Sequence, residues 1–422
     1  MEKTYWHSVV LEKDYCNGCT HCLDRCPTQA IRIVDHKAKI IESRCIDCGE
    51  CLKVCPYHAK GALVSNLEII KKFKYTVALP AISFYGQFPI EYDMNTVYNA
   101  LLELGFDEVY DLAHAAELLS VYENRILDKA HLNKPMISTY CPVITRLIQI
   151  RFPALIDHII KLEAPMEIAA RAIKKRLLSE GHEYDDIGII YITPCPAKVT
   201  SIKNPIGLSK SFIDEAISTE EIYYKIMKII DKVEPRKQLQ TATGKGIGWA
   251  RVGGQSYAME IEDYIAVDGI EEVIKVLESM ELGKLESLDF FEGYACINGC
   301  VGGPLNVENT FIGKNRIRKL TNLYGMNEPI NIDIELTPEN MEWDLPIKPM
   351  PIFKLDKDFK KALEKMSQIE ELTQKLPGVN CGACGAPTCR VLAEDIVNGF
   401  AKFEDCIFMK KDKDKGGQGH VG

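Results

Sequence analysis

Residues 16–27 read CNGCTHCLDRCP and residues 45–56 read CIDCGECLKVCP, so one cysteine pattern occurs twice near the N-terminus. Both runs have the spacing C-x2-C-x2-C-x3-C-P. The chain has 16 cysteines, and all of them fall into four groups of four. None is left over for a disulfide, which indicates a reduced protein whose thiolates bind metal centres.

The repeated run is the pattern of two-cluster bacterial ferredoxins, in which the fourth cysteine of each run binds the other cluster. It predicts two 4Fe-4S clusters, one bound by Cys16, Cys19, Cys22 and Cys55, the other by Cys45, Cys48, Cys51 and Cys26. Residues 30–34 alternate enough to form a strand of such a small α+β fold. Zinc is the alternative, but zinc sites usually pair two C-x2-C units across a gap. We expect residues 1–68 to be an electron-carrying, ferredoxin-like domain.

Composition limits the remaining functions. The 422 residues are 46% hydrophobic, enough for a substantial core, and predict several domains. The net charge of −9 argues against nucleic-acid binding, which needs a basic surface. The N-terminal residues have no apolar segment of signal-peptide length, and no uncharged run reaches the roughly 18 residues that span a bilayer. We therefore expect a cytoplasmic protein without a membrane span.

Strand and helix patterns alternate between about residues 72 and 345. Residues 75–79 and 187–192 are apolar enough for buried strands. Asn95 is expected to cap a helix that Gly105 closes, and apolar stripes at 168–177 and 270–277 precede Gly181 and Gly283. Such alternation predicts an α/β domain with parallel sheets covered by helices, in which sites form at the ends of strands.

Four cysteines lie in loops of this region. Cys141 occurs in STYCP, Cys195 in TPCPAK, and Cys296 and Cys300 in EGYACINGCVGG. As isolated residues they could equally be buried packing residues. Their surroundings favour a site, because Cys195 directly follows a predicted strand and the last motif is rich in glycine. We expect Gly299, Gly302 and Gly303 to let the backbone approach a bulky cofactor.

These three loops resemble the motifs T-S-C-C-P-x-W, M-P-C-x-x-K-K-x-E and E-x-M-x-C-x-x-G-C-x-x-G-G-G of the FeFe-hydrogenases, over residues 75–310. The resemblance implies that a cubane of the catalytic H-cluster is bound by Cys141, Cys195, Cys296 and Cys300. Cys300 would also bridge to a diiron subsite that carries carbon monoxide, cyanide and a dithiolate. Lys198 would donate a hydrogen bond to a cyanide, a task that suits a buried ammonium; the alternative is a surface lysine.

The chain also departs from the family motifs. The cysteine that relays protons in the family is replaced by Tyr140, whose reference pKa of about 10 lies above the thiol value of about 8.5. Glu123 is the nearest match to the relay glutamate of the family, although a solvated helix residue is the alternative. Further replacements surround the implied diiron pocket at Ile144, Val199, Ser201, Tyr294 and Pro304.

These departures resemble the branch of the family regarded as sensory. The resemblance implies reversible interconversion of dihydrogen with protons and electrons, slow and regulatory. One alternative is an ordinary hydrogen-evolving or hydrogen-uptake enzyme coupled to ferredoxin. Another is a non-catalytic, Narf-like protein of iron–sulfur assembly or electron transfer. Implied partners are a ferredoxin or a signalling protein, and the proteins that mature the diiron site.

The last cysteine group resembles a single-cluster domain found in corrinoid iron–sulfur proteins, with zinc as the alternative. Its C-x2-C-x4-C-x16-C spacing is formed by Cys381, Cys384, Cys389 and Cys406. A third accessory 4Fe-4S cluster is therefore expected, and Thr388 is expected to cap a helix there. Residues 335–354 look like a linker. We expect an H-cluster domain over 69–345, a mostly helical 4Fe-4S domain over 346–410 and a disordered tail over 411–422.

Overall fold

The computed structural model describes residues 6–127, 133–326, 331–350, 352 and 355–410. The chain forms two compact units. Unit 1 comprises Met1–Val10, Ile46–Gly49 and Ala62–Met350, whereas unit 2 comprises Leu11–Cys45, Glu50–Gly61 and Pro351–Gly422. The predicted tail, 411–422, lies outside the described residues, and the predicted domain bounds remain predictions.

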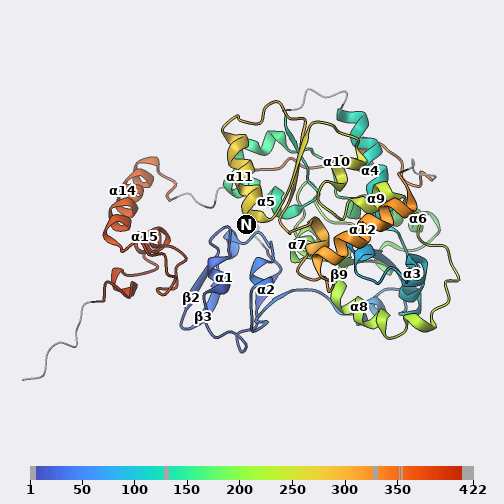
Figure 1. The fold of residues 1–422 in the computed structure, drawn as a ribbon, viewed down its shortest axis with the longest axis horizontal. Coiled ribbons are helices and arrows are strands. Elements are labelled where there is room, and N and C mark those ends of the chain that lie inside the picture. The colour runs from blue at the N-terminus through green and yellow to red at the C-terminus, as the bar shows by residue number, and fades with distance from the viewer. Residues whose placement is uncertain (1–5, 128–132, 327–330, 351, 353–354, 411–422) are drawn as a thin grey trace, which may run out of the picture. The chain divides into compact units, whose positions relative to one another are not determined.

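Unit 1 is built on two parallel sheets (Figure 1). One sheet has the strand order β6-β5-β8-β9 and the other the order β10-β11-β7. The strands are β5 (Tyr75–Pro80), β6 (Glu108–Val109), β7 (Met136–Ile137), β8 (Ile187–Thr193), β9 (Glu215–Ser218), β10 (Tyr264–Asp268) and β11 (Phe290–Tyr294). In register, Tyr75 lies beside Ile187 and Phe290 beside Met136. Every residue of β8 is buried, as expected for a strand with covered faces.

Helices cover both sheets. They are α3 (Met94–Glu103), α4 (Leu112–Leu127), α5 (Pro142–Arg151), α6 (Pro165–Ser179), α7 (Pro196–Lys203), α8 (Thr219–Met227), α9 (Gly244–Gly248), α10 (Gly254–Ala258), α11 (Ile270–Glu281), α12 (Thr310–Tyr324) and α13 (Pro338–Met341). Helices α6 and α8 pack against β8, and α11 packs against β10 and β11. The predicted α/β architecture is therefore confirmed.

Local sequence patterns predicted several of these elements correctly. The strand over 187–192 and the helices that carry the two apolar stripes are present as β8, α6 and α11. The prediction that Asn95 caps a helix was wrong, because α3 begins at Met94 and Asp93 occupies the cap position. The Asn95 side chain instead accepts hydrogen bonds from the backbone amides of Leu239 and Gln240 at 2.8 and 2.9 Å. Its role is to hold a distant loop, which helix-capping rules do not address.

The ferredoxin-like region has the expected small α+β form. Its elements are β1 (Val9–Leu11), α1 (His21–Asp24), β2 (Ile31–Val34), β3 (Lys37–Ile40), α2 (Glu50–Lys53) and β4 (Lys60–Ala62). β1 pairs with β4, and β2 pairs with β3 in an antiparallel hairpin. A small core of Cys22, Leu23, Ile31 and Ala38 closes it.

The C-terminal region is helical, as predicted, with α14 (Phe359–Lys375) and α15 (Cys389–Val397). Thr388 caps α15 by accepting a hydrogen bond from the amide of Val391 at 3.1 Å. Within unit 2, α15 is joined to the ferredoxin-like region by a two-point ion pair between Arg32 and Asp395, with N–O distances of 2.6 and 3.1 Å. Arg44 adds a 2.8 Å ion pair to Glu394. These contacts make the two cysteine-rich regions parts of one compact unit.

The segment expected to be a linker is instead packed against unit 1 up to Met350. Met341 is fully buried, the amide of Leu345 donates to the carbonyl of Gly207 at 2.8 Å, and the amide of Met350 donates to the carbonyl of Gln149 at 2.8 Å. Proline content alone therefore misled the prediction over 335–350, because prolines also suit a chain that crosses a surface without regular structure.

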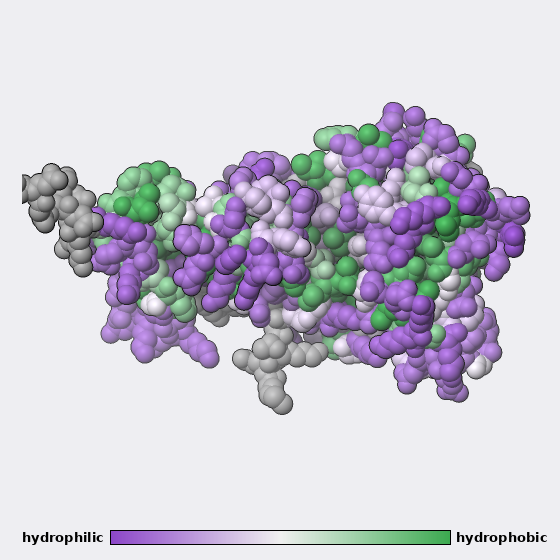
Figure 2. All heavy atoms as spheres, turned by 90° about the horizontal axis from the view of Figure 1, so that it is seen from below, coloured by the Kyte–Doolittle hydropathy of each residue, from purple (hydrophilic) through white to green (hydrophobic). Residues whose placement is uncertain are grey.

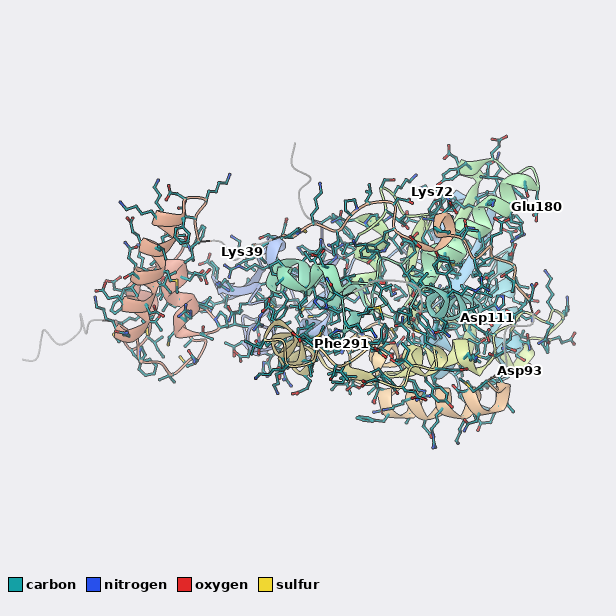
Figure 3. All side chains as sticks on the ribbon, turned by 90° about the horizontal axis from the view of Figure 1, so that it is seen from above. Lys39, Lys72, Asp93, Asp111, Glu180 and Phe291 are labelled. Atoms are coloured by element: carbon teal, nitrogen blue, oxygen red, sulfur yellow. The ribbon has the colours of Figure 1, made fainter. Side chains whose placement is uncertain are left out.

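On the face seen in Figure 2, hydrophilic residues cover much of the surface, with hydrophobic residues between them. Charged side chains such as Glu180, at the outer end of α6, extend from it (Figure 3), whereas Phe291 of β11 is buried. Among the described residues, none of the helices has the length and apolar character needed to cross a bilayer.

Candidate active site and cluster ligands

The four cysteines of the α/β region all follow carboxyl ends of parallel strands. Cys141 follows β7 at the cap position of α5, and Cys195 follows β8 at the cap position of α7. Cys296 and Cys300 follow β11, the latter within a short 3-10 turn over Gly299–Gly302. Strand ends from both sheets therefore contribute to one region, as expected for α/β proteins.

Backbone contacts hold the cysteine loops against one another. The amide of Leu305 donates to the carbonyl of Pro194 at 2.9 Å, which links the last motif to the Cys195 loop. A Cβ atom at Gly303 would lie 2.4 Å from that same carbonyl oxygen. At Gly299, Gly302 and Gly303 the nearest atoms are mainly protein backbone, so these residues bring loops together. The expectation that these glycines also let the backbone approach a cofactor stays a prediction.

The four thiols lie within electrostatic range of one another. Burial raises the pKa of Cys300 to about 12, and the neighbouring Cys141 and Cys296 raise it further while Lys198 opposes them. Burial, followed by Cys296 and Cys300, raises the pKa of Cys195 in the same way. Four thiolates so close together and so poorly hydrated need a cationic centre to stabilise them. The donor set therefore fits an iron–sulfur cluster.

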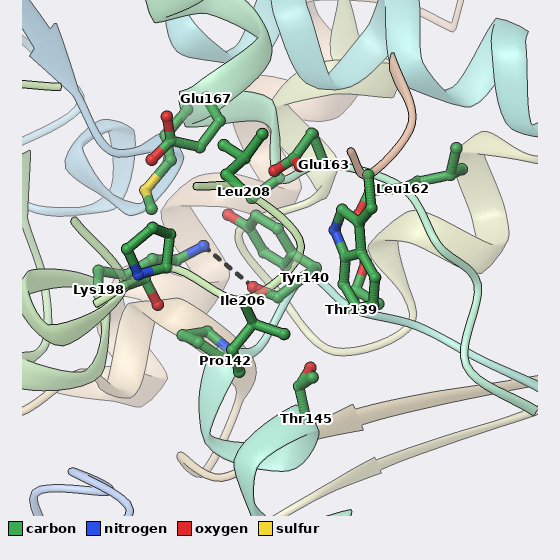
Figure 4. Close-up of a pocket in the computed structure, with 15 residues that line it drawn as sticks. Thr139, Tyr140, Pro142, Thr145, Leu162, Glu163, Glu167, Lys198, Ile206 and Leu208 are labelled. Carbon is green, nitrogen blue, oxygen red and sulfur yellow. Dashed lines mark hydrogen bonds between the residues drawn. The ribbon is translucent and has the colours of Figure 1, made fainter. Parts of the chain in front are cut away.

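Lys198 lies at the centre of this region and not at the surface. Its side chain on α7 is only 2% exposed. The ammonium donates to the carbonyl oxygen of Tyr140 at 3.0 Å and lies 4.4 Å from the centroid of the Tyr140 ring (Figure 4). It also lowers the pKa of Cys300. A fixed, buried cation beside Cys300 is what the sequence motif predicted, and the alternative of a surface lysine is excluded.

Tyr140 is a packed aromatic residue beside Cys300. Its ring makes edge contacts with Trp249 and Tyr294, at centroid distances of 5.2 and 6.0 Å. Burial, the nearby Cys300 and a hydrogen bond to that sulfur raise the pKa of Tyr140 well above its usual value. The phenol is therefore fixed as a neutral donor, which does not suit rapid proton exchange at neutral pH.

Glu123 is buried within α4 and not solvated, with an exposed fraction of 2%. Its Oε1 accepts a hydrogen bond from Gln255 at 2.8 Å, and Gln255 accepts one from Ser138 at 2.5 Å. The Ser138 hydroxyl in turn accepts from the amide of Tyr140 at 3.2 Å. Burial raises the pKa of Glu123 to about 8. A hydrogen-bonded series therefore connects Glu123 to the backbone amide of Tyr140. The group at this end of the series is a backbone amide, which does not titrate.

Sequence reasoning missed several polar residues around these loops. Glu292 opens the last motif and was given no role, yet it is buried and accepts hydrogen bonds from the amides of Gly253, Gln255 and Ser256. Glu163, two residues before α6, and Glu167, in its first turn, line a cavity beside Tyr140. No local pattern marks these two glutamates, because their sequence reads as an ordinary helix start.

In unit 2, several cysteines that are predicted to share a cluster lie near one another. The pKa of Cys22 is raised to about 11 by burial and, more weakly, by the nearby Cys19, Cys16 and Cys55. Burial raises the pKa of Cys51 to about 12, with Cys26 among its neighbours. Near the C-terminus the last four cysteines line one hollow, Cys381, Cys384, Cys389 and Cys406. Thiolates in these groups could hold clusters with the crossed ligation predicted for the repeat.

Residues 46–49 belong to unit 1 and pack beside α7. Asp47 accepts hydrogen bonds from the amides of Ser8 and Val9 at 3.0 and 3.1 Å, and from the hydroxyl of Thr200 at 2.8 Å. Cys48, a predicted cluster ligand, is the next residue along the chain. This network therefore places Cys48 close to the helix that begins at Cys195.

Comparison with known families identifies the central region. The model of the family described as "Iron only hydrogenase large subunit, C-terminal domain" matches residues 74–264 and 258–304, more than half of the chain. The chain belongs to the iron-only hydrogenase family. A 4Fe-4S dicluster domain matches residues 8–56, and an iron–sulfur cluster domain matches residues 376–408.

Individual relatives agree with this assignment to the iron-only hydrogenases. The Periplasmic Fe hydrogenase large subunit of Nitratidesulfovibrio vulgaris is 27% identical over 273 residues, which cover 59% of this chain and 65% of that protein. Iron hydrogenase 1 of Clostridium pasteurianum is 23% identical and covers 54% of this chain and 49% of its own length. The chain therefore spans less than two thirds of these relatives.

A solved structure of FeFe-hydrogenase HydA1 from Chlamydomonas reinhardtii, in a variant form, covers 68% of this chain and 98% of its own. Its sequence identity to this iron-only hydrogenase family member is 16%, and the TM-score is 0.49.

Proposed function

We propose that this protein interconverts dihydrogen with protons and electrons, 2 H+ + 2 e− ⇌ H2, at an H-cluster held by its α/β region. The proposal depends on one observation above all. Cys141, Cys195, Cys296 and Cys300 come from three separate loops and lie within electrostatic range, with the buried ammonium of Lys198 beside Cys300.

Each protein side chain at this site would have a separate role. The four cysteines would hold the cubane, and Cys300 would also bridge to the diiron subsite. When bound, the H-cluster supplies the iron chemistry that splits dihydrogen. Lys198 would hold an anionic ligand by a charge-assisted hydrogen bond, since within the described part of the chain its Nζ donates to one acceptor, the Tyr140 carbonyl. The packed rings of Tyr140, Trp249 and Tyr294 would exclude water from the part of the site next to Tyr140.

Slow turnover and a regulatory, hydrogen-sensing role are supported by Tyr140. General acid–base catalysis is most effective when the group titrates near the working pH. A buried phenol whose pKa is raised cannot exchange protons as a thiol would. Proton delivery by the family route would therefore limit the rate at this position.

A catalytic hydrogenase coupled to ferredoxin is the second candidate. It is favoured by the buried carboxyl of Glu123 and the hydrogen-bonded series from it through Gln255 and Ser138, which ends at the backbone amide of Tyr140, the residue before Cys141. The Narf-like alternative is a third candidate, in which Lys198 would only offset the negative charge of the thiolates, since it lowers the pKa of Cys300.

Three accessory 4Fe-4S clusters would carry electrons between this site and a ferredoxin or a signalling partner. The hydrogen bonds of Asp47 support a role for the neighbouring Cys48 in passing electrons to the α/β region. Insertion of the diiron subsite would need separate maturation proteins.

Infrared spectroscopy of the matured, anaerobically purified protein tests the proposal. Bands from metal-bound carbon monoxide and cyanide, together with hydrogen-dependent changes in them, are expected. A fully matured sample with four cubanes but no such bands would support the Narf-like alternative. Turnover as fast as that of ordinary catalytic hydrogenases would exclude the slow, regulatory role while leaving the chemistry intact.

A further inference from the structure

A small cavity of about 50 Å³ lies next to Tyr140 and Lys198 (Figure 4). Its lining is mixed, with apolar side chains such as Leu162 and Leu208 and polar ones such as Thr145 and Ser201. A cavity of this volume with several polar neighbours can hold ordered water.

Glu163 contributes an unusual group to this cavity. The side chain is buried, with an exposed fraction of 3%, and its Oε1 has no hydrogen-bond partner among the described residues. Burial and the nearby Glu167 raise the pKa of Glu163 to about 9, although Arg171 opposes them. A buried carboxyl without a protein partner needs water as its partner.

Glu167, four residues further on, is also buried, but its carboxylate has protein partners. Its two carboxylate oxygens accept hydrogen bonds from the hydroxyl of Ser211 at 2.5 Å and from the amide of Phe212 at 3.0 Å. Arg171 and Lys198 both lower its pKa, though burial raises it overall. Glu167 is therefore held in place by the protein, and Glu163 is the carboxyl that is able to exchange a proton with water.

Charged residues lead from Glu163 to the surface. Arg171 lies on α6 two turns after Glu163 and donates to the carbonyl oxygen of Glu339. Its guanidinium also lies 3.9 Å from the carboxylate of Asp344, whose side chain is 57% exposed. Arg171 and Asp344 both act electrostatically on Glu163. Arg171 and the exposed Asp344 therefore lie within electrostatic range of the glutamate that lines the cavity.

We propose that Glu163 is a proton-exchange residue that connects water in the Tyr140–Lys198 cavity with the surface at Asp344. The inference rests on the proposed function. Each dihydrogen that is oxidised gives two protons and two electrons. Glu163 releases its own proton to solvent, takes up one from cavity water and repeats the exchange for the second, while both electrons leave through the iron–sulfur clusters. Hydrogen formation reverses these transfers.

This route is separate from the Glu123 series, which approaches Tyr140 through Ser138 and Gln255. The groups that face Glu163 are Glu167 and Arg171 from α6, Asp344 from the segment after α13, and Tyr140 and Lys198 across the cavity. Only Glu163 and the surface carboxylate need to titrate for the exchange.

The substitution Glu163→Gln tests the inference, because it keeps the size of the side chain and removes the exchangeable carboxyl. In the matured protein, exchange between dihydrogen and deuterium oxide should slow at least tenfold. Glu163→Asp should retain more exchange than Glu163→Gln. The matched control is Glu180→Gln, at the exposed C-terminal end of α6, which should stay within twofold of the wild type.

A second measurement does not depend on activity. An infrared pH titration of the protein without its diiron site should contain a carboxylic acid band that disappears between about pH 8 and 10, and Glu163→Gln should lack this band. Visible absorbance and thermal unfolding show whether the variant retains its clusters and fold.

The outcomes separate this inference from the proposed function. A wild-type protein without carbon monoxide and cyanide bands after maturation contradicts the function itself. If the wild type has those bands and exchanges hydrogen, but Glu163→Gln exchanges as fast, the inference is wrong and the function stands. The absence of a titrating carboxyl band that depends on Glu163 also overturns the inference.

Discussion

The ammonium of Lys198 lies 3.0 Å from the carbonyl oxygen of Tyr140 and 4.4 Å from the centroid of the same residue's ring. One lysine therefore joins the loop that follows β7 to the helix that follows β8, beside Cys300. The contact fixes a positive charge where the site otherwise gathers buried thiols. It also explains how the first and second sequence motifs act as one structural feature, although 57 residues separate Lys198 from Cys141.

Replacement of Lys198 by methionine should leave the cubane in place and weaken retention of the diiron subsite. Methionine keeps the length of the chain but removes the charge and the hydrogen-bond donor. Loss of a residue that orients a metal group typically lowers affinity by about tenfold or more. Infrared band intensity per iron measures the occupancy. The control is Lys203→Met, at the exposed end of the same helix, and equal loss in both variants would contradict a specific role for Lys198.

Substitution of Tyr140 by phenylalanine should lower the reduction potential of the cubane that Cys300 binds. The variant loses the hydrogen bond to the Cys300 sulfur, which stabilises the more negative, reduced cluster. One such bond is worth about 1 kcal/mol, or about 40 mV for a one-electron couple. A redox titration followed by electron paramagnetic resonance gives the shift.

The substitution Tyr140→Cys, in contrast, should raise hydrogen turnover if proton delivery limits the rate. It also removes edge contacts to Trp249 and Tyr294, so stability should fall by about 3 kcal/mol. Turnover per intact diiron site is therefore the quantity to compare. No gain after this correction would show that another step is rate-limiting.

The stability of unit 1 should decrease as pH rises from about 5 to 8, partly because of Glu123. Burial raises the pKa of Glu123 to about 8, so the folded state holds a proton that the unfolded state has already lost. The contribution of Glu123 to the free energy of unfolding is therefore fully present at low pH and is lost as the pH rises through 8. Glu123→Gln should make the fall of the unfolding free energy with pH less steep, by about 1 kcal/mol per pH unit. Urea unfolding at several pH values measures this, and an unchanged slope would contradict the raised pKa.

Removal of the Asp395 carboxylate should loosen the C-terminal region within unit 2. Asp395→Ala leaves the guanidinium of Arg32, only 10% exposed at its side chain, without its two-point partner. We expect a loss of about 2 kcal/mol. The ion pair between Arg390 and Glu370 is more than half exposed, so Glu370→Ala should cost less than about 0.5 kcal/mol. Hydrogen exchange of the α15 amides distinguishes the two variants.

Introduction of a side chain at Gly303 should separate the Cys195 and Cys300 loops. In Gly303→Ala the new Cβ would lie 2.4 Å from the carbonyl oxygen of Pro194, which is backbone and cannot move freely. Iron bound by the α/β region should fall, and stability should drop by about 1–3 kcal/mol. Gly248→Ala is the control, because the nearest atom to its Cβ is 3.9 Å away. Comparable iron loss in both variants would argue against the steric explanation.

Local patterns predicted the elements of the fold well. The apolar strand over 187–192 and the stripes of α6 and α11 depend on neighbours within a few residues, which is the range that sequence periodicity describes. Predictions failed where a distant contact decided the outcome. Asn95 holds the backbone at Leu239 and does not cap its own helix. The segment over 335–350 packs against unit 1 through contacts that proline content cannot reveal.

In the candidate site, too, local features were predictable from the sequence and features that depend on distant contacts were not. Cysteine identity and spacing, with the position of Lys198 three residues after Cys195, were readable from the sequence. The role of Gly303 in bringing loops together was not, since the atoms that crowd it belong to Pro194, more than a hundred residues earlier. The role of Glu163 could not be predicted from the sequence for a related reason. Its importance lies in the cavity that it shares with Tyr140, and nothing in the sequence around it indicates burial.

The sequence by itself determined which residues can bind iron and which segments form strands and helices, because ligand chemistry and hydrophobic periodicity are local properties. Only the tertiary structure decided that Lys198 and Glu123 are buried, and that Tyr140 is a packed donor to Cys300. It also decided that Glu163 lines a cavity while its Oε1 has no hydrogen-bond partner among the residues that the structure describes. Burial and electrostatic surroundings are produced by residues far apart in the chain. They exist only once the two sheets have brought their strand ends together.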